Sequence, residues 1–405
     1  CIRDRVIRRA AGKRPYLWRN HREALDRGFL SKGLSAAVSF PTGGGKSTLA
    51  ELKIAAALLR GGKAVVLAPT LALVDQTAFS LQNAFRDFSV VGDLDEEITF
   101  SDLLELPEII VTTPERCLML QSLQPEAFED VGLVMFDECH LLHPREADRS
   151  RRSIDSMLCI LNLTRSAPHA DLLLISAMMQ NADEIAGWVA ELTGRPCIPL
   201  DLAWKPTRQA RGCVAYNADR IAELEDLLRS EREIATTVGV PAQLKPNLNA
   251  HPLAFFCLRQ TWATRNRSDY SLMALLDEPV EFATATNKWT GDWYLTPNGN
   301  KVAGTIAAAA AEDGLKTLTF VQSTVAAEST VRYFRSLLPE RRVSLTEEEQ
   351  TLRTLVEEEL GGPQYCYLEL DAKGRVKGGA ASHHAQLLKH ERLLHESPVS
   401  YTHLR

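Results

Sequence analysis

The sequence predicts an α/β protein in which parallel strands alternate with helices that cover both faces of the sheet. Between residues 36 and 200, five short apolar runs alternate with stretches of helical periodicity, which is the rhythm of βαβ units. Each apolar run ends in a polar or turn-forming group. A second rhythm of the same kind starts near residue 301 and is incomplete. We therefore expect two α/β domains, the second of them partial.

The domain boundaries are predicted where this alternation of strands and helices stops or starts again. A chain of 405 residues suits two or three domains, each with its own core. We expect a basic lead (1–35), a first α/β domain (36–202), a linker with an insertion (203–300) and a partial second domain (301–405). The strands expected in the first domain are 36–40, 64–70, 108–114, 131–138 and 171–177, and in the second domain we expect a strand at 316–324. Because the carboxyl ends of parallel strands meet at one edge, their polar groups should share one site.

Composition excludes several classes of protein. The chain is 45% hydrophobic and 24% charged, and no apolar run approaches the roughly 18 residues of a membrane helix, so we expect a cytoplasmic protein without membrane contact. Eight scattered cysteines indicate free thiols rather than a zinc site or disulfides. The net charge of −6 leaves room for a local basic patch, for which residues 1–32 are a candidate. A solvated helix or a frayed terminus is the simpler explanation of those residues.

The segment "FPTGGGKST" (40–48) has the features of a phosphate-binding loop. Consecutive glycines allow a tight turn with inward-facing N–H groups, and the helix that follows adds its positive N-terminal end. In the pattern G-x-x-x-x-G-K-[ST], the lysine reaches the β and γ phosphates and the hydroxyl residue binds Mg²⁺. Phe40 stands where that pattern has its first glycine. The predicted nucleotide contacts are Thr42, Gly43, Gly44, Gly45, Lys46, Ser47 and Thr48, with Ser47 as a Mg²⁺ ligand.

The segment "LVMFDECH" (133–140) supplies the acids that such a loop needs. Asp137 can hold Mg²⁺ through water, and Glu138 can orient and deprotonate the attacking water. The alternative is a pair of exposed carboxylates in a turn, but two adjacent acids at the end of a buried strand are costly without an ionic role.

Five motifs in this order, "FPTGGGKST", "APTLALVDQ", "VTTPERC", "FDECH" and "ISAMMQN", resemble motifs I, Ia, Ib, II and III of superfamily-two helicases of the DExH type. "ISAMMQNADEIAGWV" and "ASHHAQLLKHER" are similar to elements of the superkiller-type (Ski-like) branch, although Met178 and Gln386 depart from them. The resemblance implies two RecA-like P-loop NTPase domains.

The resemblance also implies roles for individual residues. His140 would bridge from the motif II acids toward Ser176 and Ala177, which would couple hydrolysis to domain movement. His21, in "LWRNHREAL", would take the place of an adenine-recognising glutamine; the alternative is a surface helix histidine. A metal role for His383 and His384 is not expected, because no third ligand is near in sequence, and a nucleic-acid contact or a packing role is expected instead. The residues implied to contact a nucleic-acid strand are Pro69, Thr70, Thr113, Pro114, Arg116, Gln322, Ser323 and His384.

The resemblance implies a helicase or translocase that couples Mg-ATP hydrolysis to movement along single-stranded DNA or RNA. A duplex translocase subunit of a nuclease or restriction-type system, and a nucleotide-dependent binding switch without unwinding, remain alternatives. Motifs V and VI, with the arginine finger, would lie beyond Arg405. Because that finger is worth about 10³ or more in rate, we expect this chain to bind Mg-ATP and to hydrolyse it poorly.

Overall fold

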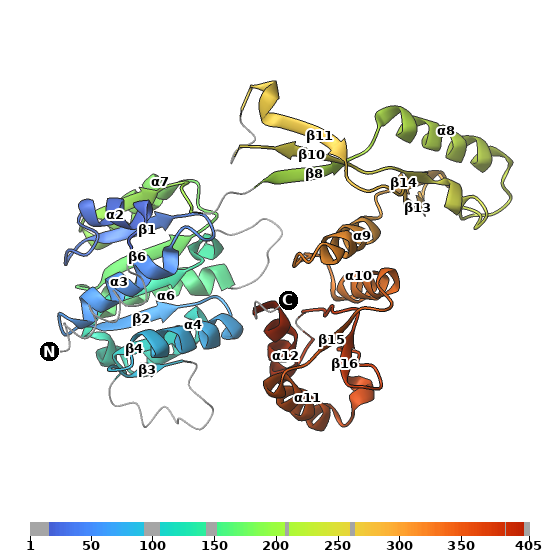
Figure 1. The fold of residues 1–405 in the computed structure, drawn as a ribbon. Coiled ribbons are helices and arrows are strands. Elements are labelled where there is room, and N and C mark those ends of the chain that lie inside the picture. The colour runs from blue at the N-terminus through green and yellow to red at the C-terminus, as the bar shows by residue number, and fades with distance from the viewer. Residues whose placement is uncertain are drawn as a thin grey trace. The chain divides into compact units, whose positions relative to one another are not determined.

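The computed structural model describes residues 16–92, 106–142, 152–206, 210–259, 264–384 and 386–400. The chain divides into two compact units, residues 1–208 and residues 209–405, which we describe separately (Figure 1). None of the helices within the described ranges is long and apolar enough to cross a membrane.

The first unit is built on a parallel sheet of seven strands. Their order is β3-β4-β2-β5-β6-β1-β7, and every neighbouring pair is parallel. The strands are β1 (Ser35–Ser39), β2 (Lys63–Leu67), β3 (Val90–Val91), β4 (Ile109–Thr112), β5 (Val131–Asp137), β6 (Asp171–Ser176) and β7 (Cys197–Asp201). The parallel sheet and its five expected strands are confirmed, whereas β3 and β7 were not expected.

Helices cover both faces of this sheet (Figure 1). They are α2 (Arg19–Asp26), α3 (Lys46–Leu58), α4 (Leu71–Ala84), α5 (Pro114–Leu123), α6 (Arg152–Ser166) and α7 (Ala182–Thr193), with short 3₁₀ turns at Pro125–Phe128 and Cys139–Leu142. Successive side chains of a strand point to opposite faces. Val66 of β2 therefore packs in the core formed with α3 and α4, while Val65 and Leu67 pack in the core formed with α5, α6 and α7.

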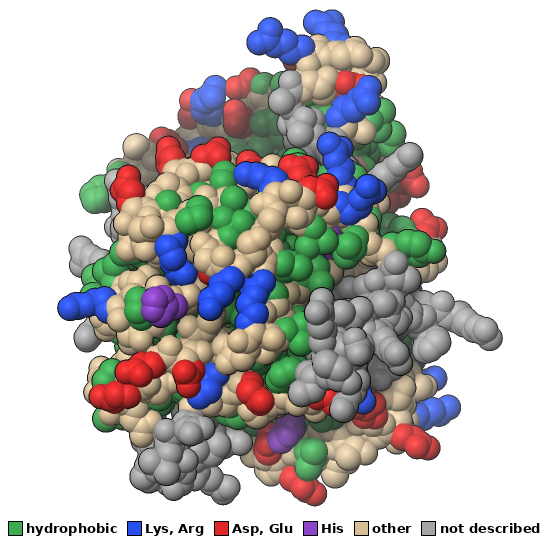
Figure 2. All heavy atoms as spheres, turned by 90° about the vertical axis from the view of Figure 1, so that its left-hand side faces the viewer, with side chains coloured by type: hydrophobic (Ala, Val, Ile, Leu, Met, Phe, Trp, Pro, Cys, Tyr) green, Lys and Arg blue, Asp and Glu red, His purple; other side chains and the backbone are tan. Residues whose placement is uncertain are grey.

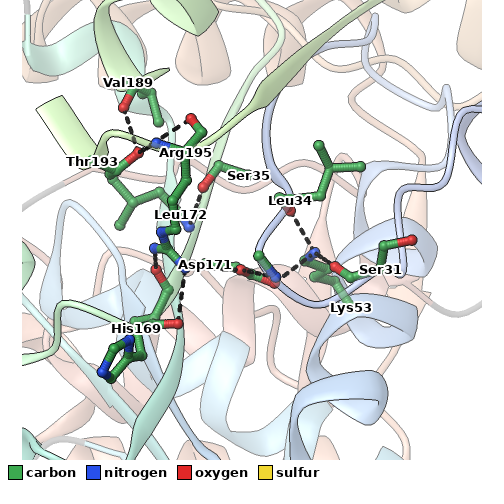
Figure 3. Close-up of polar contacts among 12 residues, drawn as sticks. Ser31, Leu34, Ser35, Lys53, His169, Asp171, Leu172, Val189, Thr193 and Arg195 are labelled. Atoms are coloured by element: carbon green, nitrogen blue, oxygen red, sulfur yellow. Dashed lines mark hydrogen bonds and ion pairs between the residues drawn. The ribbon is translucent and has the colours of Figure 1, made fainter. Parts of the chain in front are cut away.

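A buried charge network ties α3 to the amino ends of the strands (Figure 3). Lys53 Nζ lies 3.0 Å from Asp171 Oδ2, and these side chains are 2% and 5% exposed. The same ammonium donates to the carbonyl oxygens of Phe29 (2.9 Å), Ser31 (3.2 Å) and Leu34 (2.7 Å). Asp171 Oδ1 accepts from Gly33 N at 2.9 Å and lies 3.6 Å from Arg195 Nη1. We call these groups the Lys53 network.

The described part of the second unit contains small antiparallel sheets and helices. One sheet has the order β11-β10-β8, and three two-stranded pairs join β12 to β9, β13 to β14 and β15 to β16. The strands are β8 (Arg211–Ala215), β9 (Asn249–Ala250), β10 (Leu253–Cys257), β11 (Tyr270–Ala274), β12 (Val280–Glu281), β13 (Ala283–Thr286), β14 (Trp293–Thr296), β15 (Arg342–Ser344) and β16 (Arg375–Lys377). The helices are α8 (Ala218–Ile234), α9 (Gly299–Glu312), α10 (Thr324–Leu337), α11 (Glu347–Leu360) and α12 (Lys389–Ser400), with 3₁₀ turns at Lys245–Asn247, Arg267–Asp269 and Pro363–Tyr365.

The second unit departs from the expected α/β rhythm. The strand predicted at 316–324 is wrong: residues 315–321 are irregular, and Phe320 is 86% exposed. An apolar run forms a strand only when neighbouring strands pair with it and cover its side chains, and none does so in the described residues. The last helix, α12, begins at Lys389. A second RecA-like domain therefore remains a prediction.

Candidate functional site

The phosphate-binding loop predicted at 40–48 connects β1 to α3 (Figure 1). Phe40 is fully buried in the core shared with α3 and α4, so the residue that replaces the first glycine of the pattern serves packing. Gly43 and Gly45 have φ values of 78° and 93°, which side-chain-bearing residues rarely adopt. Gly44 N donates to Pro41 O at 2.8 Å, and Lys46 is the first residue of α3. The loop is therefore a tight turn at a helix N-terminus.

The two motif II acids lie at the end of β5, on the same edge of the sheet as this loop. Asp137 is the last residue of β5, and its Oδ1 accepts from Glu138 N at 3.0 Å. Among the described residues other than glycine, Glu138 alone has a positive φ, of 53°. Such a conformation costs on the order of 1 kcal/mol, and it turns the chain so that Glu138 Oε1 lies 4.0 Å from Lys46 Nζ. The loop lysine and a motif II acid thus lie within ion-pair distance.

Burial of Asp137, together with the neighbouring Glu138 charge, raises the pKa of the Asp137 carboxyl above its ordinary value. The Glu138 N–H and the Lys46 charge act in the opposite direction and do not cancel the effect. The surrounding protein groups do not fully balance the negative charge of this carboxylate, so a nearby cation would stabilise it.

His140 connects the acids to the end of β6. Its Nδ1 lies 3.2 Å from Glu138 Oε2 and 3.1 Å from Ser176 Oγ. Ser176 is the last residue of β6, and its hydroxyl oxygen also accepts from Met178 N at 3.0 Å. Ala177 follows directly in the chain. The predicted bridge from the acids through His140 to Ser176 is therefore formed.

The residues predicted to contact a strand in the first unit follow neighbouring strands β2 and β4. Thr70 is the N-cap of α4, where its hydroxyl accepts from Leu73 N at 3.4 Å, and Thr113 is the N-cap of α5, where its hydroxyl accepts from Arg116 N at 3.5 Å. Thr70 is exposed, whereas Thr113 is buried, and Pro69 and Pro114 adjoin them. Both threonines thus shape helix N-termini at the carboxyl edge of the sheet.

In the second unit, Gln322 and Ser323 are exposed, but they precede α10 instead of ending a strand. The Ser323 hydroxyl accepts from Ala326 N at 3.2 Å and caps that helix. His384 is buried, with Nε2 3.0 Å from Glu328 Oε1 and its ring edge-on to Tyr367. These contacts agree with a packing role for His384, and its contact with a strand remains a prediction.

His21 is buried in α2 and does not lie on the surface. Its Nε2 is 3.0 Å from Gly45 O, and its Nδ1 accepts from Trp18 N at 3.2 Å. The histidine therefore contacts the phosphate-binding loop, and the surface-histidine alternative is wrong. An adenine contact for His21 remains a prediction.

Two buried polar groups were missed by sequence reasoning, Asn20 beside the loop and Lys53 at the opposite edge of the sheet. Asn20, beside His21, donates from Nδ2 to Gly44 O at 2.9 Å, and nothing in its local sequence singled it out. Lys53 carried a readable signal, because it lies on the apolar stripe of α3 with Leu49, Ile54 and Ala57. A lysine on such a stripe needs a buried acceptor.

The charge of the first unit does not by itself mark a path for a strand. On the face shown in Figure 2, Lys and Arg side chains are interspersed with Asp and Glu. The basic residues of the predicted lead that precede Tyr16 lie outside the described residues. Arg27, within the lead, donates to Pro199 O at 2.6 Å.

Comparisons with known proteins agree with this geometry. Among curated proteins, the chain is similar to the ATP-dependent DNA helicase Hel308 of Thermoplasma acidophilum, with 26% identity over 178 residues, which are 43% of this chain and 25% of that protein. It is also similar to Hel308 of Pyrococcus horikoshii, with 29% identity over 199 residues, which are 47% of this chain and 25% of that protein. The chain thus spans about a quarter of the length of these relatives.

The fold is shared with a solved helicase structure. The DUF1998 helicase MrfA bound to DNA and AMPPNP aligns with a TM-score of 0.50 over 87% of this chain and 42% of that chain, at 15% identity. At this identity the likeness concerns the fold alone. Residues 19–185, which hold the loop, the motif II acids and Ser176, match the DEAD/DEAH box helicase family. This segment of the chain is therefore similar to DEAD/DEAH box helicase domains.

Proposed function

We propose that this chain carries the motor of an ATP-dependent helicase or translocase that couples Mg-ATP hydrolysis to movement along single-stranded DNA or RNA. The observation that carries this proposal is the meeting of Lys46 and Glu138, with 4.0 Å between their charged atoms, at the end of the sheet that also holds Asp137 and Ser176. Phosphoryl transfer requires this combination of a phosphate-binding lysine, a metal-holding acid and a water-positioning acid.

The residues of the loop fit a nucleoside triphosphate. A Cβ atom added to Gly43 would meet nothing within 4 Å, so the loop is open on that side, and Ser47 is exposed. Ser47 and Asp137 would hold Mg²⁺, which when bound neutralises negative charge on phosphate oxygens. The raised pKa of Asp137 is consistent with a carboxylate built for a cation partner.

The protein's own groups divide the work of hydrolysis. Lys46 binds the terminal phosphates, and Glu138 orients and deprotonates the attacking water. The ion pair with Lys46 and the contact with His140 hold the Glu138 carboxylate in place. A movement of the Glu138 side chain would reach the end of β6 through His140 and Ser176. We propose that this segment couples hydrolysis to domain movement.

The strand would run across the carboxyl edge of the first unit. The N-termini of α4 and α5 lie there, capped by Thr70 and Thr113, and helix N-termini bind phosphate without reading sequence. Pro69, Pro114 and Arg116 adjoin these caps. Gln322 and Ser323, exposed ahead of α10, are the proposed contacts in the second unit. The curated relatives are named as DNA helicases, so we propose DNA as the strand. From the motif resemblance, we propose that the chain belongs to the superkiller-type branch.

The test is the affinity of the chain for a single strand of DNA or RNA, with and without a non-hydrolysable Mg-ATP analogue, at fixed salt. We expect nucleotide-dependent binding that Lys46→Ala removes. Arg165→Ala, an exposed change in the last turn of α6, serves as control. Equal strand affinity in both nucleotide states, with unchanged nucleotide affinity in Lys46→Ala, would refute the proposal.

The two alternatives predict other outcomes. A duplex translocase displaces a third strand from a triplex without separating a duplex. A binding switch changes its strand affinity with nucleotide but displaces neither. Strand- and triplex-displacement assays therefore distinguish these functions from a helicase.

A further inference from the structure

The phosphate-binding loop is held from outside by two consecutive side chains of α2. Asn20 Nδ2 donates to the carbonyl oxygen of Gly44 at 2.9 Å, and His21 Nε2 lies 3.0 Å from the carbonyl oxygen of Gly45. Both side chains lie in the interior, Asn20 being 0% and His21 2% exposed. Two peptide groups of the loop are therefore fixed from the same side.

Peptide geometry converts these contacts into an orientation of the loop. In a trans peptide the C=O and the following N–H point in opposite directions, and the structure has no cis bond in its described residues. Holding Gly44 O and Gly45 O against α2 therefore directs the N–H groups of Gly45 and Lys46 away from α2. Successive N–H groups presented in this way form an anion-binding concavity.

The protonation of His21 follows from its neighbours. Trp18 N donates to Nδ1 at 3.2 Å, which assigns the ring proton to Nε2, where it is donated to Gly45 O. The Trp18 ring stacks on the imidazole with 5.6 Å between centroids and fixes its plane. A Cβ on Gly45 would lie 2.2 Å from Nε2, so the imidazole occupies the space that any side chain there would need.

The Asn20 amide is also shared with the segment that follows β7. Its Nδ2 donates to Trp204 O at 2.9 Å, and the Trp204 ring is edge-on to Trp18 at 6.2 Å. Both neighbours of Nδ2 are carbonyl oxygens, which fixes the amide orientation. Asn20 Oδ1 is left buried without a partner among the described residues. An unsatisfied buried oxygen is costly, so the position is built around the two donated hydrogen bonds.

We propose that Asn20 and His21 are positioning residues that preorganise the Gly43–Lys46 loop for a polyphosphate, with the Trp204 carbonyl as their anchor. This inference rests on the proposed function and deepens it, because it assigns the two residues to the phosphate end of the nucleotide. Loss of either contact lowers affinity for any ligand that carries the same polyphosphate, whatever its base.

The experiment compares ATP with inorganic tripolyphosphate as competitors for a fluorescent ADP on the full chain. Asn20→Ala removes one donor from the loop, so we expect both competitors to weaken by about tenfold, with an unchanged ratio between them. His21→Ala should do the same. A selective loss of ATP affinity in His21→Ala, with tripolyphosphate unaffected, would instead make His21 an adenine contact and overturn the assignment.

Controls separate positioning from folding and from failure of the proposed function. Arg22→Ala, on the exposed side of α2, should bind both competitors as the parent does. His21→Ala leaves Asn20 in place and removes only the second contact, so it tests the inference even if Asn20→Ala does not fold. Unchanged affinity in Lys46→Ala would refute the proposed function. Loss in Lys46→Ala with none in Asn20→Ala or in His21→Ala would refute this inference alone.

Discussion

Replacing Lys53 by methionine tests whether the Lys53 network holds the first unit together. Methionine keeps most of the buried stem and removes the ammonium. The change deprives Asp171 Oδ2 of its partner at 3.0 Å and deprives three carbonyl oxygens of a donor. Asp171 keeps Gly33 N at 2.9 Å and Arg195 at 3.6 Å.

The loss of stability can be estimated from the contacts that Asp171 keeps in Lys53→Met. Removing one partner of a buried pair costs about 3–5 kcal/mol, because the other charge is left uncompensated. The two surviving contacts of Asp171 place the cost at the lower end, at about 3 kcal/mol. Since domains are stable by about 5–15 kcal/mol, the variant should still fold. In Lys53→Met with Asp171→Asn, the stranded charge is gone, so the double change should cost at least about 1 kcal/mol less than the sum of the single changes.

Hydrogen exchange followed by mass spectrometry measures this cost locally in the full chain. Peptides from β1 and α3 should exchange about a hundredfold faster in Lys53→Met, since each 1.4 kcal/mol is a factor of ten. Lys63→Met is a matched control, because Lys63 pairs at 4.0 Å with Asp130, whose side chain is 79% exposed. Such surface pairs contribute at most about 1 kcal/mol. Equal protection in Lys53→Met and Lys63→Met would refute the reasoning.

Three further predictions concern the carboxyl edge. The folded pKa of Asp137 lies above its unfolded value, so its carboxylate destabilises the fold at neutral pH; Asp137→Asn should raise the melting temperature at pH 7–8, with the gain vanishing as pH falls toward 4. A gain that is independent of pH would contradict this. Glu138→Gln should retain nucleotide affinity within about threefold and lower ATP turnover by about 10² or more, so equal turnover would remove Glu138 from the chemistry. Thr113→Ala should cost about 1 kcal/mol in chemical denaturation through loss of the α5 cap, while Thr113→Ser should cost less.

The sequence was informative where local pattern and tertiary environment agree. Apolar runs such as 64–70 and 171–177 became β2 and β6 because their side chains are buried on both faces of the sheet. The loop and the motif II acids were found because their chemistry needs fixed residue types at fixed spacings. β3 was missed because it has two residues, too few for a periodic signal.

The remaining differences are tertiary in origin. The run at 316–324 has strand composition, but composition does not supply the pairing partners that a strand needs. For His384 the sequence left a nucleic-acid contact and a packing role open, because it does not reveal that Tyr367 and Glu328 lie against the ring. Asn20 was missed for the same reason, since its partners Gly44 and Trp204 are 24 and 184 residues away.

The first unit separates stabilising from functional groups along the strand direction. At the amino ends, Lys53 and Asp171 are buried with nearly all their polar atoms engaged. At the carboxyl ends, Asp137 has a raised pKa and Glu138 has a left-handed backbone, and both features oppose folding. Side chains that bind a ligand lack some of their partners in the protein alone, and this lowers the stability of the fold. Other contacts in the same domain have to offset that loss. Because the two groups lie at opposite ends of the strands, their effects should add, and Asp137→Asn should recover in Lys53→Met the same stability at neutral pH that it gains in the parent chain.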